Sequence, residues 1–105
     1  MPDRAAKTPV VAFSMPVDYR AYPVLFVDDE QHNLVAFRYA FEDRFTVYTA
    51  ISSEEGLEIL QERDIAVLLT DQRMPEMTGV ELCTRAREVR PSTVRILVTA
   101  YADLH

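Results

Sequence analysis

The sequence predicts one α/β domain built on a doubly wound, parallel sheet. Short apolar segments that suit buried strands alternate with longer segments of helical periodicity, in the order strand, helix, strand, helix, strand, helix, strand. The connections are short, which favours right-handed crossovers between parallel strands. The chain has 105 residues, of which 49% are apolar and 27% are charged, and this size and balance suit a single globular domain.

Residues 1–23 are predicted to be a proline-rich amino-terminal extension, followed by a domain over residues 24–105. Proline recurs in this extension every seven residues, at Pro2, Pro9, Pro16 and Pro23. Because proline interrupts both helices and sheet ladders, the segment does not suit regular structure. Residues 9–13 can still pack on the domain as an arm, and a partly ordered extension is favoured over a second domain.

The first predicted strand, residues 24–27, is an uninterrupted apolar run, which suits a strand buried on both faces. A helical stripe assigned to the core follows it, at Leu34, Phe37 and Phe41. Residues 45–49 are rich in β-branched and aromatic side chains and predict the second strand. The third strand is predicted at residues 65–70, and the fourth at residues 94–98.

Two pairs with capping-box spacing mark the starts of the second and third helices. These pairs are Ser52 with Glu55, and Thr78 with Glu81. The positions expected to face inward are Leu57 and Leu60 in the second helix, and Leu82, Ala86 and Val89 in the third. Pro91 follows the third helix, which it cannot continue.

Composition excludes several classes of protein. The net charge of −6, from 17 acidic and 11 basic residues, argues against direct contact with nucleic acid. The single cysteine, Cys83, cannot form an internal disulfide. No apolar run approaches the ~20 residues that span a bilayer, so we expect no membrane association and a cytoplasmic location. Gly56 and Gly79 are the only glycines, which excludes a glycine-rich dinucleotide-binding loop.

Polar side chains follow three of the predicted strands. Asp28, Asp29 and Glu30 follow the first, Asp71 the third and Thr99 the fourth. Ligands of open parallel sheets bind at this edge. If the first and third strands are neighbours, repulsion among the carboxylates predicts a divalent cation, and hard oxygen ligands favour Mg²⁺. A carboxylate beside Mg²⁺, with a hydroxyl donor nearby, suits phosphoryl transfer onto the carboxylate. The alternative is that each acid caps a helix or faces solvent.

Three segments together resemble the receiver domains of two-component response regulators. They are residues 27–30 (Val-Asp-Asp-Glu), residues 69–79 (Leu-Thr-Asp-Gln-Arg-Met-Pro-Glu-Met-Thr-Gly) and residues 97–102 (Leu-Val-Thr-Ala-Tyr-Ala). The resemblance begins at Val24, runs to the end of the chain, and implies the flavodoxin-like receiver fold. In motif the chain is similar to receivers of nitrogen-regulator-type transcription factors, hydrogenase-expression regulators among them. Such domains are regulatory and assist only their own phosphorylation and dephosphorylation.

The resemblance implies a role for each residue of the acidic site. Asp71 would be the phosphoacceptor for a sensor histidine kinase. Asp29 and Asp71 would bind Mg²⁺ through their carboxylates. Arg73 would add its backbone carbonyl, and Asp28 would contact the ion through water. Thr99 would act as the switch that contacts the phosphoryl group.

The resemblance also implies a set of modulating residues. The side chain of Arg73 and Tyr101 would regulate access of water and the rate of dephosphorylation, and the small Ala100 would let the substrate reach the site. Gly79 is expected to serve the loop beside Asp71 through its backbone freedom. The guanidinium of Arg73 has a second possible role, which is to reach the acidic cluster in place of a lysine or the metal. An exposed loop arginine is the favoured interpretation.

Complete receivers continue into a fifth strand, which carries a lysine, and a last helix. Neither falls within this chain, whose one lysine is Lys7. We therefore expect Mg²⁺ binding with poor phosphorylation, and an open apolar face on the side of the Leu34 helix. A fragment of a longer regulator is favoured, with its output domain in the remainder or in a separate chain. One alternative is a truncated gene product. In the other, a partner, the proline-rich arm or a second copy of the chain fills the place of the missing strand and helix. We also expect marginal stability or self-association, such as a homodimer.

The competing hypothesis is a pseudo-receiver, an interaction or dimerisation module that never uses phosphate. The missing lysine favours it, whereas the acidic residues and Thr99 favour the phosphoacceptor. A phosphatase with an aspartate nucleophile fits poorly, because Asp-Asp-Glu at residues 28–30 differs from the Asp-x-Asp of those enzymes.

Overall fold

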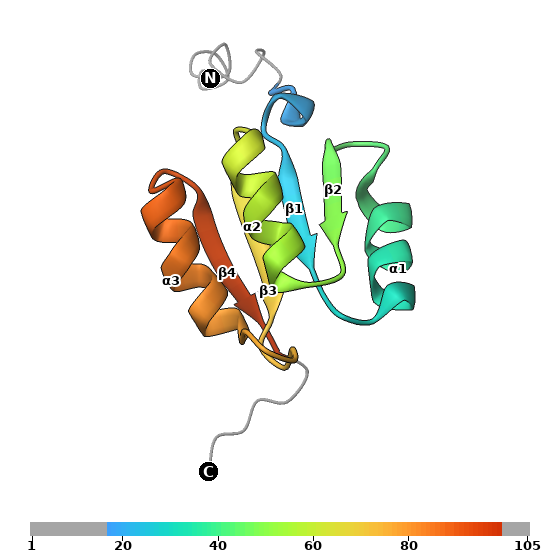
Figure 1. The fold of residues 1–105 in the computed structure, drawn as a ribbon. Helices are drawn as coiled ribbons and strands as arrows, with labels where there is room; N and C mark the ends of the chain where they lie inside the picture. The colour runs from blue at the N-terminus through green and yellow to red at the C-terminus, as the bar shows by residue number, and fades with distance from the viewer. Residues whose placement is uncertain (1–16, 100–105) are drawn as a thin grey trace, which may run out of the picture.

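The computed structural model describes residues 17–99. The elements in chain order are the 3₁₀ helix η3 (Tyr19–Ala21), β1 (Val24–Val27), α1 (Gln31–Phe41), β2 (Val47–Ala50), α2 (Ser53–Glu62), β3 (Val67–Asp71), α3 (Gly79–Val89) and β4 (Val94–Val98). The strands form one parallel sheet in the order β2-β1-β3-β4. Helices α2 and α3 cover one face of this sheet, and α1 lies on the other (Figure 1). The predicted doubly wound α/β arrangement is confirmed.

Strand β1 lies inside the sheet, between β2 and β3. The register places Val27 opposite Ala50 of β2 and opposite Thr70 of β3. Strand β3 in turn pairs Asp71 with Val98 of β4. The carboxyl ends of β1, β3 and β4 therefore lie side by side at one edge, and the residues that follow them are brought together.

The main core lies between the sheet and helices α2 and α3. Its fully buried side chains include Leu25, Val27, Leu60, Leu68, Leu82 and Ala86. Successive strand side chains point to opposite faces, so Phe26 lies on the α1 side of the sheet. There its ring meets that of Phe37, with the ring centroids 4.6 Å apart. Helix α1 is thus attached by a small aromatic cluster rather than by the main core.

Strands β2 and β3 each begin two residues later than predicted. Phe45 lies before β2, and its ring contacts those of Tyr19 and Phe41 at centroid distances of 5.5 and 6.2 Å. Ile65 lies before β3, is buried, and accepts a 2.6 Å hydrogen bond from the Thr93 hydroxyl through its carbonyl. Phe45 packs against other aromatic rings and Ile65 packs in the core, which explains their apolar character. Both residues lie outside the paired strands.

The two predicted helix starts are confirmed, although only one capping box is complete. Thr78 accepts a hydrogen bond from the Glu81 amide, and the Glu81 carboxylate accepts one of 2.8 Å from the Thr78 amide. At α2 the Ser52 hydroxyl accepts from the Glu55 amide at 3.1 Å. The Glu55 carboxylate, however, accepts from the Ile51 amide, one residue earlier than the motif requires.

Two positions assigned to the core are exposed instead. Phe41 exposes 41% of its surface and Val89 exposes 37%, whereas Leu34 is buried and Phe37 is half-buried. Val89 is the last residue of α3, and at this end the contact with α2 is made by Arg90. Phe41 borders a groove on the α1 face that no described element covers.

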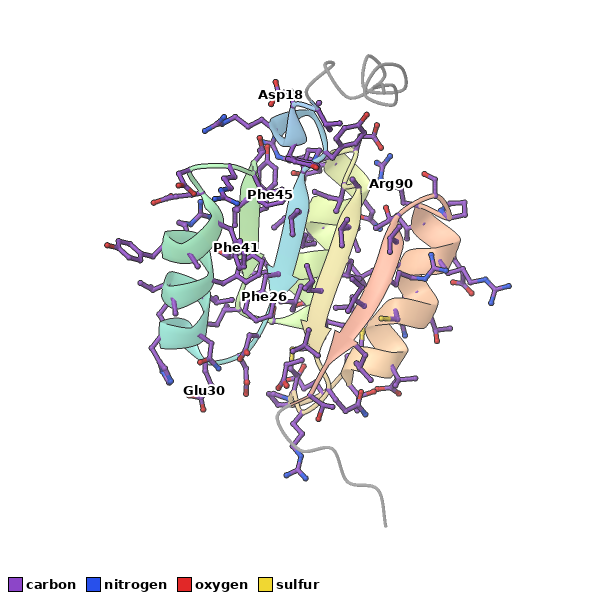
Figure 2. All side chains as sticks on the ribbon, turned by 180° about the vertical axis from the view of Figure 1, so that it is seen from behind. Asp18, Phe26, Glu30, Phe41, Phe45 and Arg90 are labelled. Atoms are coloured by element: carbon purple, nitrogen blue, oxygen red, sulfur yellow. The ribbon has the colours of Figure 1, made fainter. Side chains whose placement is uncertain are left out.

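The open apolar face expected from the sequence is present in the described part of the chain. Figure 2 looks onto this face, with Phe45, Phe41 and Phe26 one below another between α1 and the sheet. On β4, Val94, Ile96 and Val98 expose between 40% and 56% of their surface. Within residues 17–99, β4 pairs with β3 alone. None of the helices in this range is long and apolar enough to cross a bilayer.

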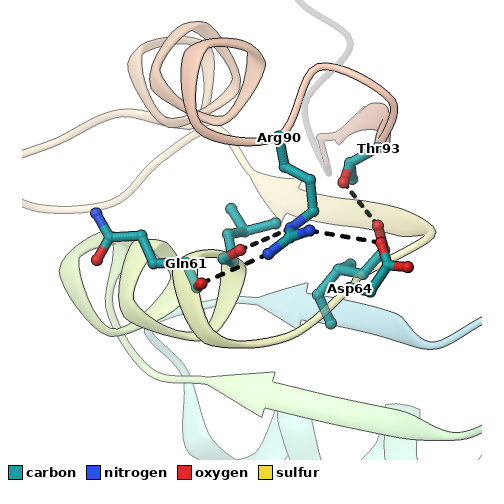
Figure 3. A network of polar contacts seen from close by, with 6 residues as sticks. Gln61, Asp64, Arg90 and Thr93 are labelled. Atoms are coloured by element: carbon teal, nitrogen blue, oxygen red, sulfur yellow. Dashed lines mark hydrogen bonds and ion pairs between the residues drawn. The ribbon is translucent and has the colours of Figure 1, made fainter.

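A polar network joins the ends of α2 and α3 (Figure 3). Arg90 donates from Nε to the Leu60 carbonyl at 2.8 Å and lies 3.5 Å from the Asp64 carboxylate. Beside it, Thr93 makes its short hydrogen bond to Ile65. These bonds satisfy the Leu60 carbonyl in the last turn of α2 and the Ile65 carbonyl after the helix, and they join the start of β4 to the loop before β3.

Candidate functional site

Three carboxylates meet at the carboxyl edge of the sheet. Asp28 and Asp29 directly follow β1, and Asp71 is the last residue of the neighbouring strand β3. One oxygen from each carboxylate lies within 4.8 Å of the other two. The neighbouring placement of these strands is the condition on which the sequence prediction depended.

Asp28 is the most enclosed of the three, with 6% of its surface exposed. Its Oδ1 accepts a 2.9 Å hydrogen bond from the Glu30 amide, and its Oδ2 accepts one of 3.1 Å from Asn33 Nδ2. The carboxylate therefore supports the start of α1, as the capping alternative proposed, while it also faces the acidic cluster. Sequence reasoning missed Asn33, whose only signal is its place in the first turn of the helix after the acidic triplet.

Asp71 carries the clearest electrostatic signature of the cluster. Burial and the neighbouring Asp28 carboxylate raise its pKa above the usual value, and Asp29 adds a smaller effect in the same direction. Hydrogen bonds from the backbone amides of Gln72 and Arg73 oppose this rise and lower the pKa in part. The net upward direction means that burial and repulsion from the neighbouring acids together outweigh these two hydrogen bonds.

A broad pocket of about 830 Å³ contains the cluster. Asp28, Asp29 and Asp71 line it together with Thr99 and Arg73. Thr99 is exposed and directly follows β4, so its placement beside Asp71 follows from the pairing of β3 with β4. The apolar side of the pocket includes the rings of Phe26 on β1 and of Phe37 and Phe41 on α1. Ala100 and Tyr101, which were predicted to modulate the site, lie outside the described residues.

The loop after β3 is tightly packed around the end of that strand. Gln72 accepts from the Gly79 amide through its carbonyl at 3.2 Å, and from the Val80 amide through its side chain at 2.9 Å. A Cβ on Gly79 would lie 2.4 Å from the Asp71 carbonyl oxygen. Gly79 is therefore required for this close approach and not for backbone freedom, since its φ is not positive. The left-handed residue of the loop is Glu76, with φ of 71°, which sequence reasoning missed.

The donor set fits a hard divalent cation. All three side chains offer carboxylate oxygens, and the pocket is open enough to leave water molecules on the ion, as Mg²⁺ prefers. A bound cation would also relieve the repulsion that raises the pKa of Asp71. The residues present thus match the ion that the sequence predicted.

Comparison with known proteins identifies the family. The family model described as the response regulator receiver domain matches residues 24–105. The chain belongs to this family. Receivers of this family are regulatory modules of two-component systems, and the four-stranded sheet with its acidic edge is the part of the receiver fold that this chain contains.

Curated relatives are transcriptional regulators. The hydrogenase transcriptional regulatory protein HoxA of Cupriavidus necator is 41% identical over 80 residues, which cover 76% of this chain and 17% of that protein. The transcriptional regulatory protein GlrR of Escherichia coli is 32% identical over 83 residues, 77% of this chain and 18% of that protein. The receiver therefore spans less than a fifth of the length of these two relatives.

Solved structures agree with the sequence comparison. A receiver domain protein from Clostridium thermocellum has a TM-score of 0.73 and 34% identity, covering 79% of this chain and 68% of that one. A CheY-like receiver from Methanospirillum hungatei has a TM-score of 0.74 and 32% identity, covering 79% of this chain and 67% of that one. The predicted receiver fold is confirmed.

Proposed function

We propose that this receiver accepts a phosphoryl group from a sensor histidine kinase onto Asp71. The observation that supports the proposal best is the convergence of three carboxylates within 4.8 Å at the end of β3, in a pocket that Thr99 also lines. Three carboxylates this close together, one of them buried, repel one another without a cation, so the arrangement favours a chemical rather than a stabilising role.

In the proposed reaction a carboxylate oxygen of Asp71 attacks the phosphorus of a phosphohistidine. The O–P bond of an acyl phosphate forms while the P–N bond breaks, and the imidazole nitrogen keeps the electron pair and takes up a proton. Asp71 suits the role of nucleophile because it lines the pocket and is only half-buried. Asp28, in contrast, uses both oxygens to accept hydrogen bonds, from the Glu30 amide and from the Asn33 side chain.

The contrast between the half-buried Asp71 and the enclosed, hydrogen-bonded Asp28 also supports the proposed metal ligands. Asp29 and Asp71 would bind Mg²⁺ directly through their carboxylates, with the Arg73 backbone carbonyl as a third protein ligand. Asp28 would contact the ion through water, since its oxygens are already engaged and enclosed. When bound, the ion would neutralise charge on the carboxylates and on the transferring phosphoryl group.

The remaining residues of the pocket have supporting roles in this proposal. Thr99 would donate its hydroxyl to an oxygen of the new phosphoryl group, which would couple phosphorylation to the far side of the sheet. Ala100 would leave room for the incoming phosphohistidine. Tyr101 and the Arg73 side chain would regulate the entry of water and hence the lifetime of the acyl phosphate.

The setting proposed for the module is a two-component system in the cytoplasm. Its direct partner would be the kinase, and its output would pass to a domain that follows residue 105 or to a separate effector. The curated relatives are transcriptional regulators, so regulation of transcription is the proposed output. Direct contact with nucleic acid is not proposed for a module with a net charge of −6.

Phosphorylation by a small acyl phosphate tests the proposal without the kinase. Incubation with acetyl phosphate and Mg²⁺ should add the mass of one phosphoryl group to the intact chain, as measured by mass spectrometry. Asp71→Asn should abolish the gain, whereas Asp43→Asn, at an exposed position before β2, should not. An equal gain in the Asp71→Asn variant would reject Asp71 as the acceptor.

The pseudo-receiver, an interaction or dimerisation module that never uses phosphate, remains the alternative proposal. The two candidates differ in the acetyl phosphate experiment. A pseudo-receiver would show no gain of mass at any concentration of donor, while Mg²⁺ still binds to the acidic cluster.

A further inference from the structure

A buried hydroxyl lies against the loop that follows Asp71. Ser53 is the first residue of α2 and exposes 4% of its surface. Its hydroxyl donates a 2.9 Å hydrogen bond to the Met77 carbonyl and lies 3.9 Å from Met74 Sδ. Met74 and Met77 both belong to the loop between β3 and α3. The hydroxyl therefore joins two segments that are distant in the sequence and meet at the carboxyl edge of the sheet (Figure 1).

The hydroxyl of Ser53 is not needed to begin the helix. The cap of α2 is Ser52, whose hydroxyl accepts a hydrogen bond from the Glu55 amide. A buried hydroxyl costs free energy unless it has a hydrogen-bond partner, whereas an alanine would suit the first turn of a helix without that cost. The contact with the Met77 carbonyl therefore accounts for a polar side chain at this buried position.

The loop between β3 and α3 carries backbone groups of the proposed site. The amides of Gln72 and Arg73 donate to the Asp71 carboxylate, and the Arg73 carbonyl is the proposed third metal ligand. Later in the loop, Glu76 adopts a left-handed backbone with φ of 71°. A residue other than glycine is strained in this conformation, so surrounding contacts must hold it there. Met77 directly follows Glu76, and the hydrogen bond from α2 to its carbonyl therefore fixes the chain at this turn.

We propose that Ser53 is a positioning residue of the phosphoacceptor site and acts on it from α2 through the loop. Its hydrogen bond to the Met77 carbonyl holds the turn at Glu76, and with it the backbone of residues 72 and 73 beside the Asp71 carboxylate. Ser53 does not line the acidic pocket, so its effect on the site is indirect. This inference rests on the proposed function, because it assigns Ser53 to the metal and phosphoryl site proposed around Asp71.

Amide hydrogen exchange in the metal-free full chain tests the effect on the loop. In Ser53→Ala, the amides of Met77 and Gly79, which donate to loop carbonyls, should exchange roughly tenfold faster, as expected for the loss of one buried hydrogen bond. Thr93→Val is the matched control, because it also removes a buried hydroxyl that donates to a carbonyl, away from the loop. It should leave the exchange of these two amides unchanged. Equal exchange of the loop amides in Ser53→Ala and the unmodified chain would overturn the proposal.

Calorimetric titration of the same three chains with Mg²⁺ tests the effect on the site. Ser53→Ala should weaken Mg²⁺ binding by roughly tenfold, because the backbone that supports Asp71 and supplies the Arg73 carbonyl is no longer held in place. Thr93→Val should bind Mg²⁺ as the unmodified chain does, so a general loss of stability cannot produce the expected difference. Equal Mg²⁺ affinity in Ser53→Ala and the unmodified chain would overturn this inference alone. Absence of Mg²⁺ uptake by the unmodified chain would instead reject the proposed metal site, and this inference with it.

Discussion

Gly79 lies against the backbone of Asp71, so closely that a Cβ on residue 79 would come 2.4 Å from the Asp71 carbonyl oxygen and 2.7 Å from Leu97 Cδ1. The first residue of α3 is thus packed directly on the residue proposed to accept the phosphoryl group. This contact packs the start of α3 against the end of β3 and against strand β4.

Substitution of Gly79 should therefore be costly. Gly79→Ala should lower the free energy of unfolding by about 2–3 kcal/mol, because the added methyl meets backbone that cannot move aside. Gly56→Ala is the matched control, since its Cβ would meet the Val27 side chain at 2.9 Å and the helix gains from alanine. Urea unfolding measures both. Equal stability of the two variants would contradict the steric interpretation.

The raised pKa of Asp71 predicts a pH-dependent gain in stability for Asp71→Asn without divalent cations. Because the folded pKa is raised, the folded state holds the proton more tightly than the unfolded state does. Stability of the unmodified chain should fall as pH rises from the ordinary aspartate value through the folded one, and then level off. The variant lacks this loss, so its advantage should be larger at neutral pH than at acid pH.

Urea unfolding at a series of pH values, with a chelator present, checks this sign. Added Mg²⁺ should reduce the difference between the two chains, because the ion binds the folded unmodified site and stabilises it. A variant that is less stable than the unmodified chain at neutral pH would show that the acidic cluster is not under electrostatic strain.

Thr93 offers a test of the packing that holds β4 in place. Thr93→Val should lower the free energy of unfolding by about 1–3 kcal/mol, because the buried Ile65 carbonyl loses its 2.6 Å hydrogen bond. Thr84→Val removes a hydroxyl from the exposed side of α3 and should change stability by less than about 0.5 kcal/mol. Thermal unfolding followed by circular dichroism compares the two.

Asn33 is predicted to position Asp28. Asn33→Ala should weaken Mg²⁺ binding by about tenfold, because the hydrogen bond that orients the Asp28 carboxylate is lost. Gln31→Ala, two residues earlier on α1, should leave the affinity unchanged. Unchanged affinity in Asn33→Ala would mean that the carboxylate keeps its orientation without this donor.

The sheet and the acidic edge could be predicted because their signals are local. Buried parallel strands appear as unbroken apolar runs, such as residues 24–27, and the acids stand directly after them. What could not be predicted depends on long-range contacts. Phe41 has the spacing of a core residue, yet it is exposed because nothing described covers its face. In the loop after β3 the left-handed backbone belongs to Glu76 and not to a glycine. Gly79 is needed for its close approach to Asp71, a contact that the type of residue alone does not reveal.

Calorimetric titration with Mg²⁺ is the most direct measurement of whether residues 28, 29 and 71 form a functional site. The geometry predicts uptake of one ion per chain, with affinity strongly reduced in Asp29→Asn and in Asp71→Asn, and unchanged in Asp43→Asn. Absence of ion uptake by the unmodified chain, or equal affinity in all three variants, would contradict the assignment of this edge of the sheet as a metal-assisted phosphoacceptor site.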